Sequence, residues 1–183
     1  MAAKTQYYTA TTLDGFIADE NNSLSWLFES DSGPDRFKPF FAQVGALAMG
    51  RTTYEWILEH DQLLENPLKW ADHYGDTPAW VFSNHELSPI PGANLHFVRG
   101  DVRPVHEAMT AAAAGRAIWL VGGGELVGQF ADAGLLDEII AQIAPVTLGA
   151  GAPLLPRRLP SSRLTLTGVE QVAQFAFLTY EVS

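Results

Sequence analysis

Apolar and polar positions recur along this chain with two periods, one typical of strands and one typical of helices. Residues 5–12 are rich in β-branched and aromatic side chains, which favour an extended strand. Between residues 105 and 112, apolar residues recur at i, i+3, i+4 and i+7, the spacing of an amphipathic helix, and Asp101 is placed to cap it. This alternation of short strands and helices predicts an α/β layered fold.

The other apolar runs predict a mostly parallel sheet with an antiparallel edge. Further strands are expected at 46–49, 79–82, 95–98, 117–121 and 138–144. The C-terminal segments 164–169 and 173–182 alternate apolar and polar residues, which predicts an antiparallel hairpin. We therefore expect one domain over 1–183, with a central mixed sheet and helices on both of its faces.

Helices and loops fill the spaces between these strands. Pro34 is placed to open a helix that runs to about residue 43, and further helices are expected over 52–58 and after Gly124. Residues 13–33 contain turn-forming pairs and predict a long loop. Residues 59–77 have no clear period and predict an irregular surface segment.

Composition and charge limit the chemistry. The chain has no cysteine, which excludes disulfides, thiolate metal sites and cysteine nucleophiles. Its formal net charge of −10 disfavours nucleic acid and anionic membranes as partners, so an anionic ligand would have to be held by backbone N–H groups and a few placed cations. There is no apolar run long enough for a membrane span and no secretory signal pattern, so a cytoplasmic location is expected.

We expect no metal site. Four of the histidines share no metal-like spacing and are predicted to be surface residues: His60, His73, His96 and His106.

Two segments carry a strand directly into the start of a helix. In the first, an apolar strand reaches three glycines, and the helix after them would point free N–H groups at an anion; its residues are Val121, Gly122, Gly123, Gly124, Glu125 and Leu126. In the second, an arginine and two hydroxyls follow a short strand, in Gly50, Arg51, Thr52 and Thr53. A tight turn without a ligand is the alternative for the first, and a solvated arginine with a threonine cap for the second. Together the two helix starts could hold the two phosphates of a dinucleotide.

A third group of polar residues follows two neighbouring predicted strands. Ser83, Asn84 and His85 come after one of them, and Arg99 comes after the next. Hydroxyl, amide, imidazole and guanidinium groups at adjacent strand ends could form a pocket for a phosphate monoester. Ordinary polar loop residues are the alternative.

The order of four motifs resembles a known family. Residues 12–18 (TLDGFIA), 49–54 (MGRTTY), 121–124 (VGGG) and 145–151 (PVTLGAG) occur in the order and spacing of the dihydrofolate-reductase-like family, which includes the reductase domain of bifunctional riboflavin-synthesis proteins. The resemblance covers nearly the whole chain. It implies a dihydrofolate-reductase-like three-layer fold that binds NADPH and delivers hydride to a pterin- or pyrimidine-like heterocycle.

The resemblance also implies roles for the motif residues. The two strand-to-helix segments would hold the pyrophosphate and adenosine side of NADPH, and Ser83, Asn84, His85 and Arg99 would surround the 2′-phosphate. Members of the family often have a cis bond at the position of Gly122 and Gly123. The nicotinamide would lie near Ala10 and Ile17, beneath a closing loop over 13–28. Homodimers are common among riboflavin-type members, so the resemblance also implies that a homodimer could form through the C-terminal strands.

The substrate side departs from true dihydrofolate reductase. Asp35 is the best match for the carboxylate of the first helix that assists protonation, with Asp31 and Glu29 as rivals, and a simple helix-start acid as the alternative. Further substrate candidates are Asp14, Trp26 and Tyr54. Gly75-Asp76-Thr77-Pro78 stands where an arginine for the folate tail is expected, which disfavours dihydrofolate. The riboflavin-pathway match is also incomplete, because no second basic cluster for a ribose phosphate is evident.

Three functions stay open at this point. A pyridine-nucleotide reductase acting on a heterocycle is favoured by the two strand-to-helix segments and the basic pocket. A non-catalytic nucleotide-binding or sensing module on the same fold is the second. An oligomeric scaffold that uses the exposed sheet edges is the third.

Overall fold

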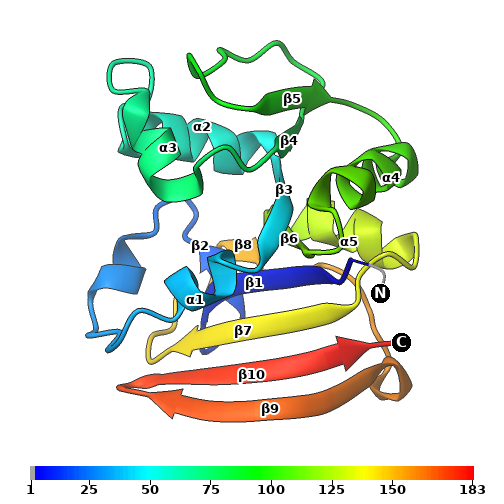
Figure 1. Cartoon of the computed structure of the whole chain (residues 1–183). Coiled ribbons are helices and arrows are strands. Elements are labelled where there is room, and N and C mark those ends of the chain that lie inside the picture. Colours follow the sequence, from blue (N-terminus) through cyan, green and yellow to red (C-terminus); the bar gives the residue numbers. More distant parts are fainter. Residues whose placement is uncertain (1–2) are drawn as a thin grey trace.

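The computed structural model describes residues 3–183 and contains a central sheet of eight strands in the order β5-β4-β3-β6-β1-β7-β10-β9 (Figure 1). These strands are β1 (Thr5–Thr12), β3 (Val44–Gly50), β4 (Ala79–Phe82), β5 (Leu95–Val98), β6 (Ala117–Gly122), β7 (Glu138–Ala144), β9 (Leu164–Val172) and β10 (Phe175–Val182). Strand β10 pairs antiparallel with both β7 and β9, whereas the other neighbours in the sheet are parallel. The expected mixed sheet with a C-terminal hairpin is confirmed; the first two residues of the expected domain lie outside the described part.

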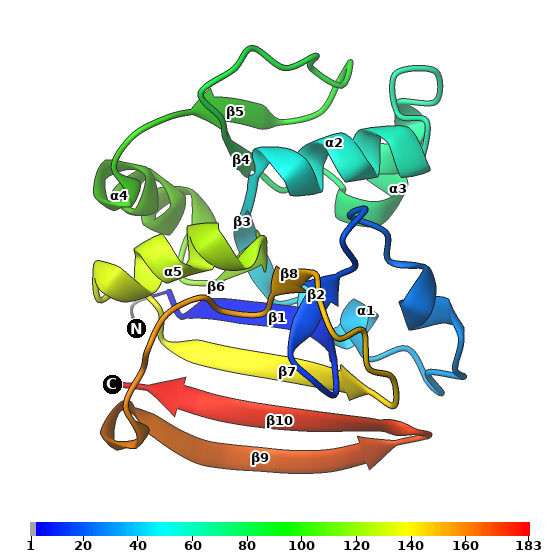
Figure 2. The same ribbon diagram turned by 180° about the vertical axis from the view of Figure 1, so that it is seen from behind.

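Helices cover both faces of this sheet (Figures 1 and 2). They are α1 (Phe37–Phe41), α2 (Arg51–His60), α3 (Leu68–Tyr74), α4 (Val102–Ala113) and α5 (Gly124–Asp132). Two 3-10 turns span Ser25–Phe28 and Ser161–Arg163, and a small second sheet pairs β2 (Phe16–Ala18) with β8 (Ala152–Pro153). In the described part of the chain, no helix is long and apolar enough to span a bilayer.

Two hydrophobic cores form because successive strand residues point to opposite faces of the sheet. In β3, Ala46 and Ala48 pack in the core beneath α4 and α5, while Leu47 and Met49 pack in the core beneath α2 and α3. These four side chains are fully buried. A parallel strand buried on both faces therefore reads as a continuous apolar run, which is why the sequence predicts it so clearly.

Helix α4 approaches β3 closely at Gly45. A Cβ atom added to Gly45 would lie 2.5 Å from the carbonyl oxygen of Ala113 and 2.9 Å from the Cβ of Arg116. Both neighbours belong to the end of α4 and the turn after it, so they are fixed by backbone. Only glycine permits this contact between helix and strand.

Several local expectations were wrong because tertiary contacts override local patterns. The helix expected from Pro34 is shorter and spans only Phe37–Phe41. The segment 59–77 is not irregular, since it contains α3, whose Trp70 is almost fully buried. The loop 13–33 also includes β2 and a 3-10 turn.

One histidine prediction was also wrong. His106 is half-buried on α4, and its Nε2 lies 2.8 Å from the Oγ1 of the fully buried Thr5. Burial lowers the pKa of His106 below its ordinary value. The N-cap predicted for the same helix is confirmed, because the Asp101 side chain accepts a hydrogen bond from the backbone N–H of Arg103.

We expect Gly45→Ala to destabilise the protein by about 1–3 kcal/mol, because the added methyl group has no space between β3 and α4. Urea unfolding would measure this as a lower midpoint with an unchanged slope. Ala111→Ser, at an exposed position on α4, is the control and should change stability by less than about 0.5 kcal/mol. Equal stability of the Gly45→Ala variant and the control would contradict this account of the packing.

Candidate functional site

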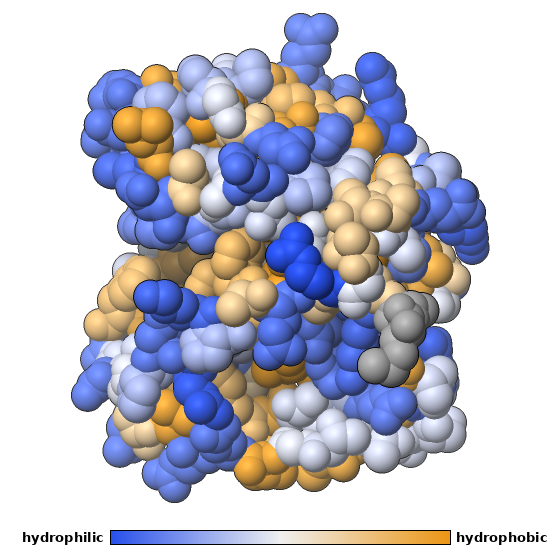
Figure 3. All heavy atoms as spheres, in the orientation of Figure 1, coloured by the Kyte–Doolittle hydropathy of each residue, from blue (hydrophilic) through white to orange (hydrophobic). Residues whose placement is uncertain are grey.

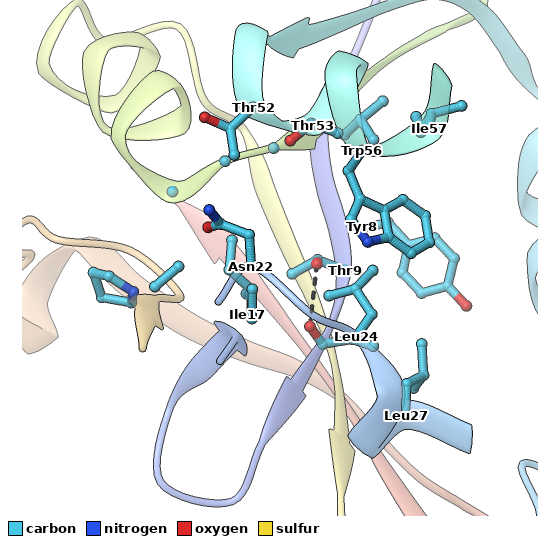
Figure 4. A pocket seen from close by; sticks show the side chains of 18 of the residues that line it. Tyr8, Thr9, Ile17, Asn22, Leu24, Leu27, Thr52, Thr53, Trp56 and Ile57 are labelled. Atoms are coloured by element: carbon cyan, nitrogen blue, oxygen red, sulfur yellow. Dashed lines mark hydrogen bonds between the residues drawn. The ribbon is translucent and has the colours of Figure 1, made fainter. Parts of the chain in front are cut away.

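A cavity of about 690 Å³ lies where β1 and β6 end and α2 and α5 begin (Figure 4). Strand β1 contributes Tyr8, Thr9 and Ala10, and α2 contributes Thr52, Thr53 and Trp56. Figure 3 shows a hollow bordered by apolar surface at this level of the molecule. The site is at the carboxyl ends of parallel strands, where open α/β sheets usually bind ligands.

One end of the cavity is formed by the starts of two helices. Gly50 caps α2 and Gly123 caps α5, and neither helix has a hydrogen bond from a capping side chain. The N–H groups of a helix's first turn have no partner within the helix, and they carry its positive dipole end. Thr52 and Thr53 add hydroxyl groups beside them (Figure 4). This end of the cavity is suited to an anion.

The glycines of the 122–124 segment differ in the space around them. A Cβ atom on Gly122 or Gly123 would meet nothing closer than 3.9 Å, namely Thr53 Oγ1 and Ile17 Cδ1 respectively. A Cβ atom on Gly124 would instead lie 2.5 Å from the carbonyl oxygen of Pro153. The first two glycines thus leave open space beside the backbone, and the third allows α5 to pack on the 153–154 segment. The Gly122–Gly123 peptide is cis, as the resemblance implies.

The other end of the cavity is apolar and aromatic. Tyr8 and Trp26 are almost fully buried, and Ile17, Leu24 and Trp56 are half-buried around them. Burial, and next the negative charge of Asp35, raise the pKa of Tyr8 to about 12, so its hydroxyl keeps its proton at neutral pH. A flat ring would find wide apolar surfaces here and few competing polar groups.

Asp35 and Asp31 lie outside this cavity, in an adjoining hollow of about 460 Å³ that shares Tyr8, Leu27, Phe37 and Gln142 with it. Asp35 Oδ1 accepts hydrogen bonds from the backbone N–H groups of Phe37 and Lys38, so this carboxylate caps α1. Asp31 Oδ1 accepts one from the backbone of Gly33. Each carboxylate therefore stabilises its own loop by accepting backbone hydrogen bonds through one of its two oxygens.

Two of the expected substrate residues, Asp14 and Tyr54, make hydrogen bonds outside the cavity. Asp14 accepts hydrogen bonds from Thr12 Oγ1 at 2.6 Å and from the N–H of Gly149 at 2.7 Å, and it does not line the cavity. The hydrogen bond from Thr12, followed by those from the backbone, lowers the pKa of Asp14 below its ordinary value. Tyr54 is fully buried and donates its hydroxyl to the carbonyl oxygen of Ser88 at 2.7 Å. Both side chains hold loops together in this structure, and neither lines the cavity.

The expected cofactor residues at the two helix starts and near the nicotinamide divide into three groups. The first lines the cavity and consists of Ala10, Ile17, Thr52, Thr53, Val121, Gly122, Gly123, Gly124 and Glu125. The second lies next to it: Gly50 at the cap of α2, and Arg51, which is exposed and bonded to Glu55 at 3.0 Å. Leu126 forms the third, since its side chain is buried in the core beneath α5 and not in the cavity.

Ser83, Asn84, His85 and Arg99 gather at the ends of β4 and β5. The Ser83 N–H donates to the carbonyl oxygen of Val98 at 2.9 Å, which places Arg99 beside Ser83. The Ser83 hydroxyl exchanges hydrogen bonds with the backbone of His85, while Asn84, His85 and Arg99 are exposed. The four residues are neighbours, as the sequence predicts, but they lie outside the cavity.

Sequence reasoning missed Trp56, Leu24 and Asn22, which also line the cavity. Trp56 had a usable signal, since it lies four residues after Thr52 and therefore on the same face of α2. Leu24 and Asn22 lie in the loop 13–28 that the resemblance places over the nicotinamide, but an irregular loop has no period from which its inward-facing side chains can be deduced.

Comparisons with known proteins agree with this architecture. Residues 3–177 match the model of the RibD C-terminal domain. The chain belongs to this family. It is 33% identical over 181 residues to the uncharacterized protein YwjB of Bacillus subtilis, with 98% of each chain covered.

Two solved structures extend the comparison. A putative riboflavin biosynthesis protein from Shewanella sp. PV-4 is 26% identical, with a TM-score of 0.78 over 100% of this chain and 99% of that one. Dihydrofolate reductase from Enterococcus faecalis, complexed with NADP(H), is 16% identical, with a TM-score of 0.60 over 100% and 99% of the two chains. The second likeness concerns the fold alone, and it confirms the dihydrofolate-reductase-like class.

We expect Asp14→Asn to lower the melting temperature at about pH 7, because the charged acceptor joining residues 12–14 to 148–149 is lost. The pKa of Asp14 is lowered from 3.8 by folding, so its stabilisation is present above that pH and disappears as the pH falls below it. The difference from wild type, followed by circular dichroism, should therefore shrink as the pH is lowered below 3.8. Asp72→Asn, exposed on α3, is the control. A deficit that persists unchanged in acid would contradict this role.

Proposed function

We propose that this protein is an NADPH-dependent reductase that transfers hydride to a flat, pterin- or pyrimidine-like heterocycle. One observation carries the proposal: a single cavity joins two glycine-capped helix starts at one end to a wide aromatic and apolar surface at the other. The first end suits a pyrophosphate and the second suits stacked rings. Family membership and a fold shared with an NADP(H)-binding dihydrofolate reductase support this assignment.

The residues present fit this cofactor. The pyrophosphate would be held by the backbone N–H groups at the starts of α2 and α5, with the hydroxyls of Thr52 and Thr53. The open space beside Gly122 and Gly123 admits a ligand close to the backbone. The bound nicotinamide would supply the hydride, and Ala10 and Ile17 would lie on its side of the cavity.

The protein's own contribution is to orient the rings and exclude water. Leu24, Trp26 and Trp56 provide apolar walls against which both rings can be held in reacting geometry. Closing the site off from water with such walls protects the hydride step. The hollow that contains Asp35 adjoins this cavity, since Tyr8 and Gln142 border both spaces, and a proton from that hollow would have to be relayed past them to the acceptor.

A non-catalytic nucleotide-binding module is the second candidate. The position of Asp35 favours it, because this carboxylate caps α1 and does not line the main cavity. Such a module would bind NADPH without oxidising it in the presence of any acceptor.

The first test combines binding with turnover. At a concentration about 100 times its Kd, NADPH should raise the free energy of unfolding by about 2.7 kcal/mol, seen as a clear rise in melting temperature. Loss of NADPH absorbance with unphosphorylated and phosphorylated pterins and pyrimidines would then identify the acceptor. Binding without oxidation of NADPH would favour the module, and no thermal shift with any nucleotide would remove the cofactor from the proposal.

A second test concerns the choice of NADPH over NADH. We propose that Arg99 contacts the 2′-phosphate, so Arg99→Met should weaken NADPH binding by roughly tenfold through the loss of a charge-assisted hydrogen bond. NADH binding should be unchanged, because NADH lacks this phosphate. Arg116→Met, which removes the charge of another exposed arginine, is the matched control. Equal losses for both cofactors would contradict the assignment.

A further inference from the structure

Glu125 is an unexpected residue at the anion-binding end of the cavity. It is the second residue of α5, it lines the cavity, and its side chain is largely exposed. An acid in a helix's first turn ordinarily interacts with the free N–H groups there and with the positive dipole end. A carboxylate placed in this way would compete with a phosphate for the same groups and would repel it.

Arg157 binds this carboxylate from the neighbouring segment. Its Nη2 donates to Glu125 Oε1 at 2.6 Å and its Nη1 donates to Glu125 Oε2 at 3.0 Å, which is a two-point contact that occupies both oxygens. Among the described residues, these are the hydrogen bonds that the Glu125 side chain makes, and none goes to the N–H groups of its own helix. The contact also lowers the pKa of Glu125, which keeps this side chain ionised and paired.

The rest of the Arg157 side chain is fixed along α5. Its Nε donates to Asp132 Oδ2 at 2.7 Å, and its Nη1 also donates to the carbonyl oxygen of Pro156 at 2.8 Å. Between the two acids, a Cβ atom on Gly128 would lie 2.8 Å from Arg157 Cζ, so the missing side chain of Gly128 leaves room for the guanidinium. Glu125, Gly128 and Asp132 thus lie along one face of α5 and together hold this arginine.

We propose that Arg157 is a positioning residue that keeps the start of α5 available to the cofactor's phosphates by binding and neutralising Glu125. Arg157 draws the carboxylate towards residues 156–157 and away from the helix N–H groups. In a chain of net charge −10, this pairing removes a negative charge that lies beside the anion site. The inference rests on the proposed function, because it concerns binding of NADPH to that same cavity.

The experiment measures the Kd of NADPH by fluorescence titration for wild type, Arg157→Met, Glu125→Gln and the double variant. Arg157→Met should weaken binding by roughly tenfold, since it leaves an unpaired carboxylate close to the phosphates. Glu125→Gln should bind at least as tightly as wild type, and the double variant should return to within about threefold of it. Arg157→Lys, which keeps the charge, should recover most of the affinity.

Two controls separate this role from a purely structural one. Arg158→Met removes the same charge from an exposed neighbour that makes no side-chain hydrogen bond among residues 3–183, and it should leave the Kd unchanged. The deficit of Arg157→Met should also shrink between about 0.05 M and about 0.5 M salt, because ions screen the exposed carboxylate. Melting temperatures of all variants would establish that each is folded during the titration.

The outcomes are distinct. If wild type binds no NADPH, the proposed function itself fails. If wild type binds and Arg157→Met resembles Arg158→Met, only the role of Arg157 is overturned. A loss in Arg157→Met that Glu125→Gln does not restore would also overturn it, because the arginine would then contact the phosphate directly or support only the fold.

Discussion

The walls of the cavity depend on one close contact between backbones. The first turn of α5 packs on residues 153–154, so closely that a Cβ atom on Gly124 would lie 2.5 Å from one carbonyl oxygen and 2.6 Å from the next. Gly151, with a φ of +144°, makes a comparable approach to the carbonyl oxygen of Ala18. Because these two glycines have no side chains, β8 can pack closely between α5 and β2. A side chain at either position would separate the elements that enclose the ligand space.

The order of the strands places this contact at the edge of the sheet where the cavity lies. Strand β1 lies between β6 and β7 and runs parallel to both, so the glycine segment after β6 and the start of the loop after β1 reach the same edge of the sheet. Strand β3, on the other side of β6, brings the start of α2 to that edge. Two helix dipoles and the aromatic end of one core therefore converge on a single cavity.

At the end of the cavity formed by the starts of α2 and α5, the positive groups are backbone N–H groups, because the arginines near it already have acidic partners. Within residues 3–183, Arg51 is bonded to Glu55, Arg157 to Glu125 and Asp132, and Arg36 to Glu170. In each of these groups the guanidinium charge is offset by its own carboxylate partners, of which Arg157 has two. The helix N–H groups then supply positive potential locally, at the starts of α2 and α5.

The sequence by itself determined the eight strands of the main sheet, most of the helices and the residues at the two helix starts. Each of these leaves a local signal: a buried parallel strand is a continuous apolar run, and a glycine-rich strand-to-helix turn is a short contiguous motif. Asp14, Tyr54 and Asp35 were assigned by position along the chain, yet their hydrogen bonds to Gly149, Ser88 and the start of α1 decide what they do. The pairing of Arg157 with Glu125, 32 residues away, is visible only in the tertiary structure. A contact between residues so far apart in the sequence produces no periodic pattern from which it could be predicted.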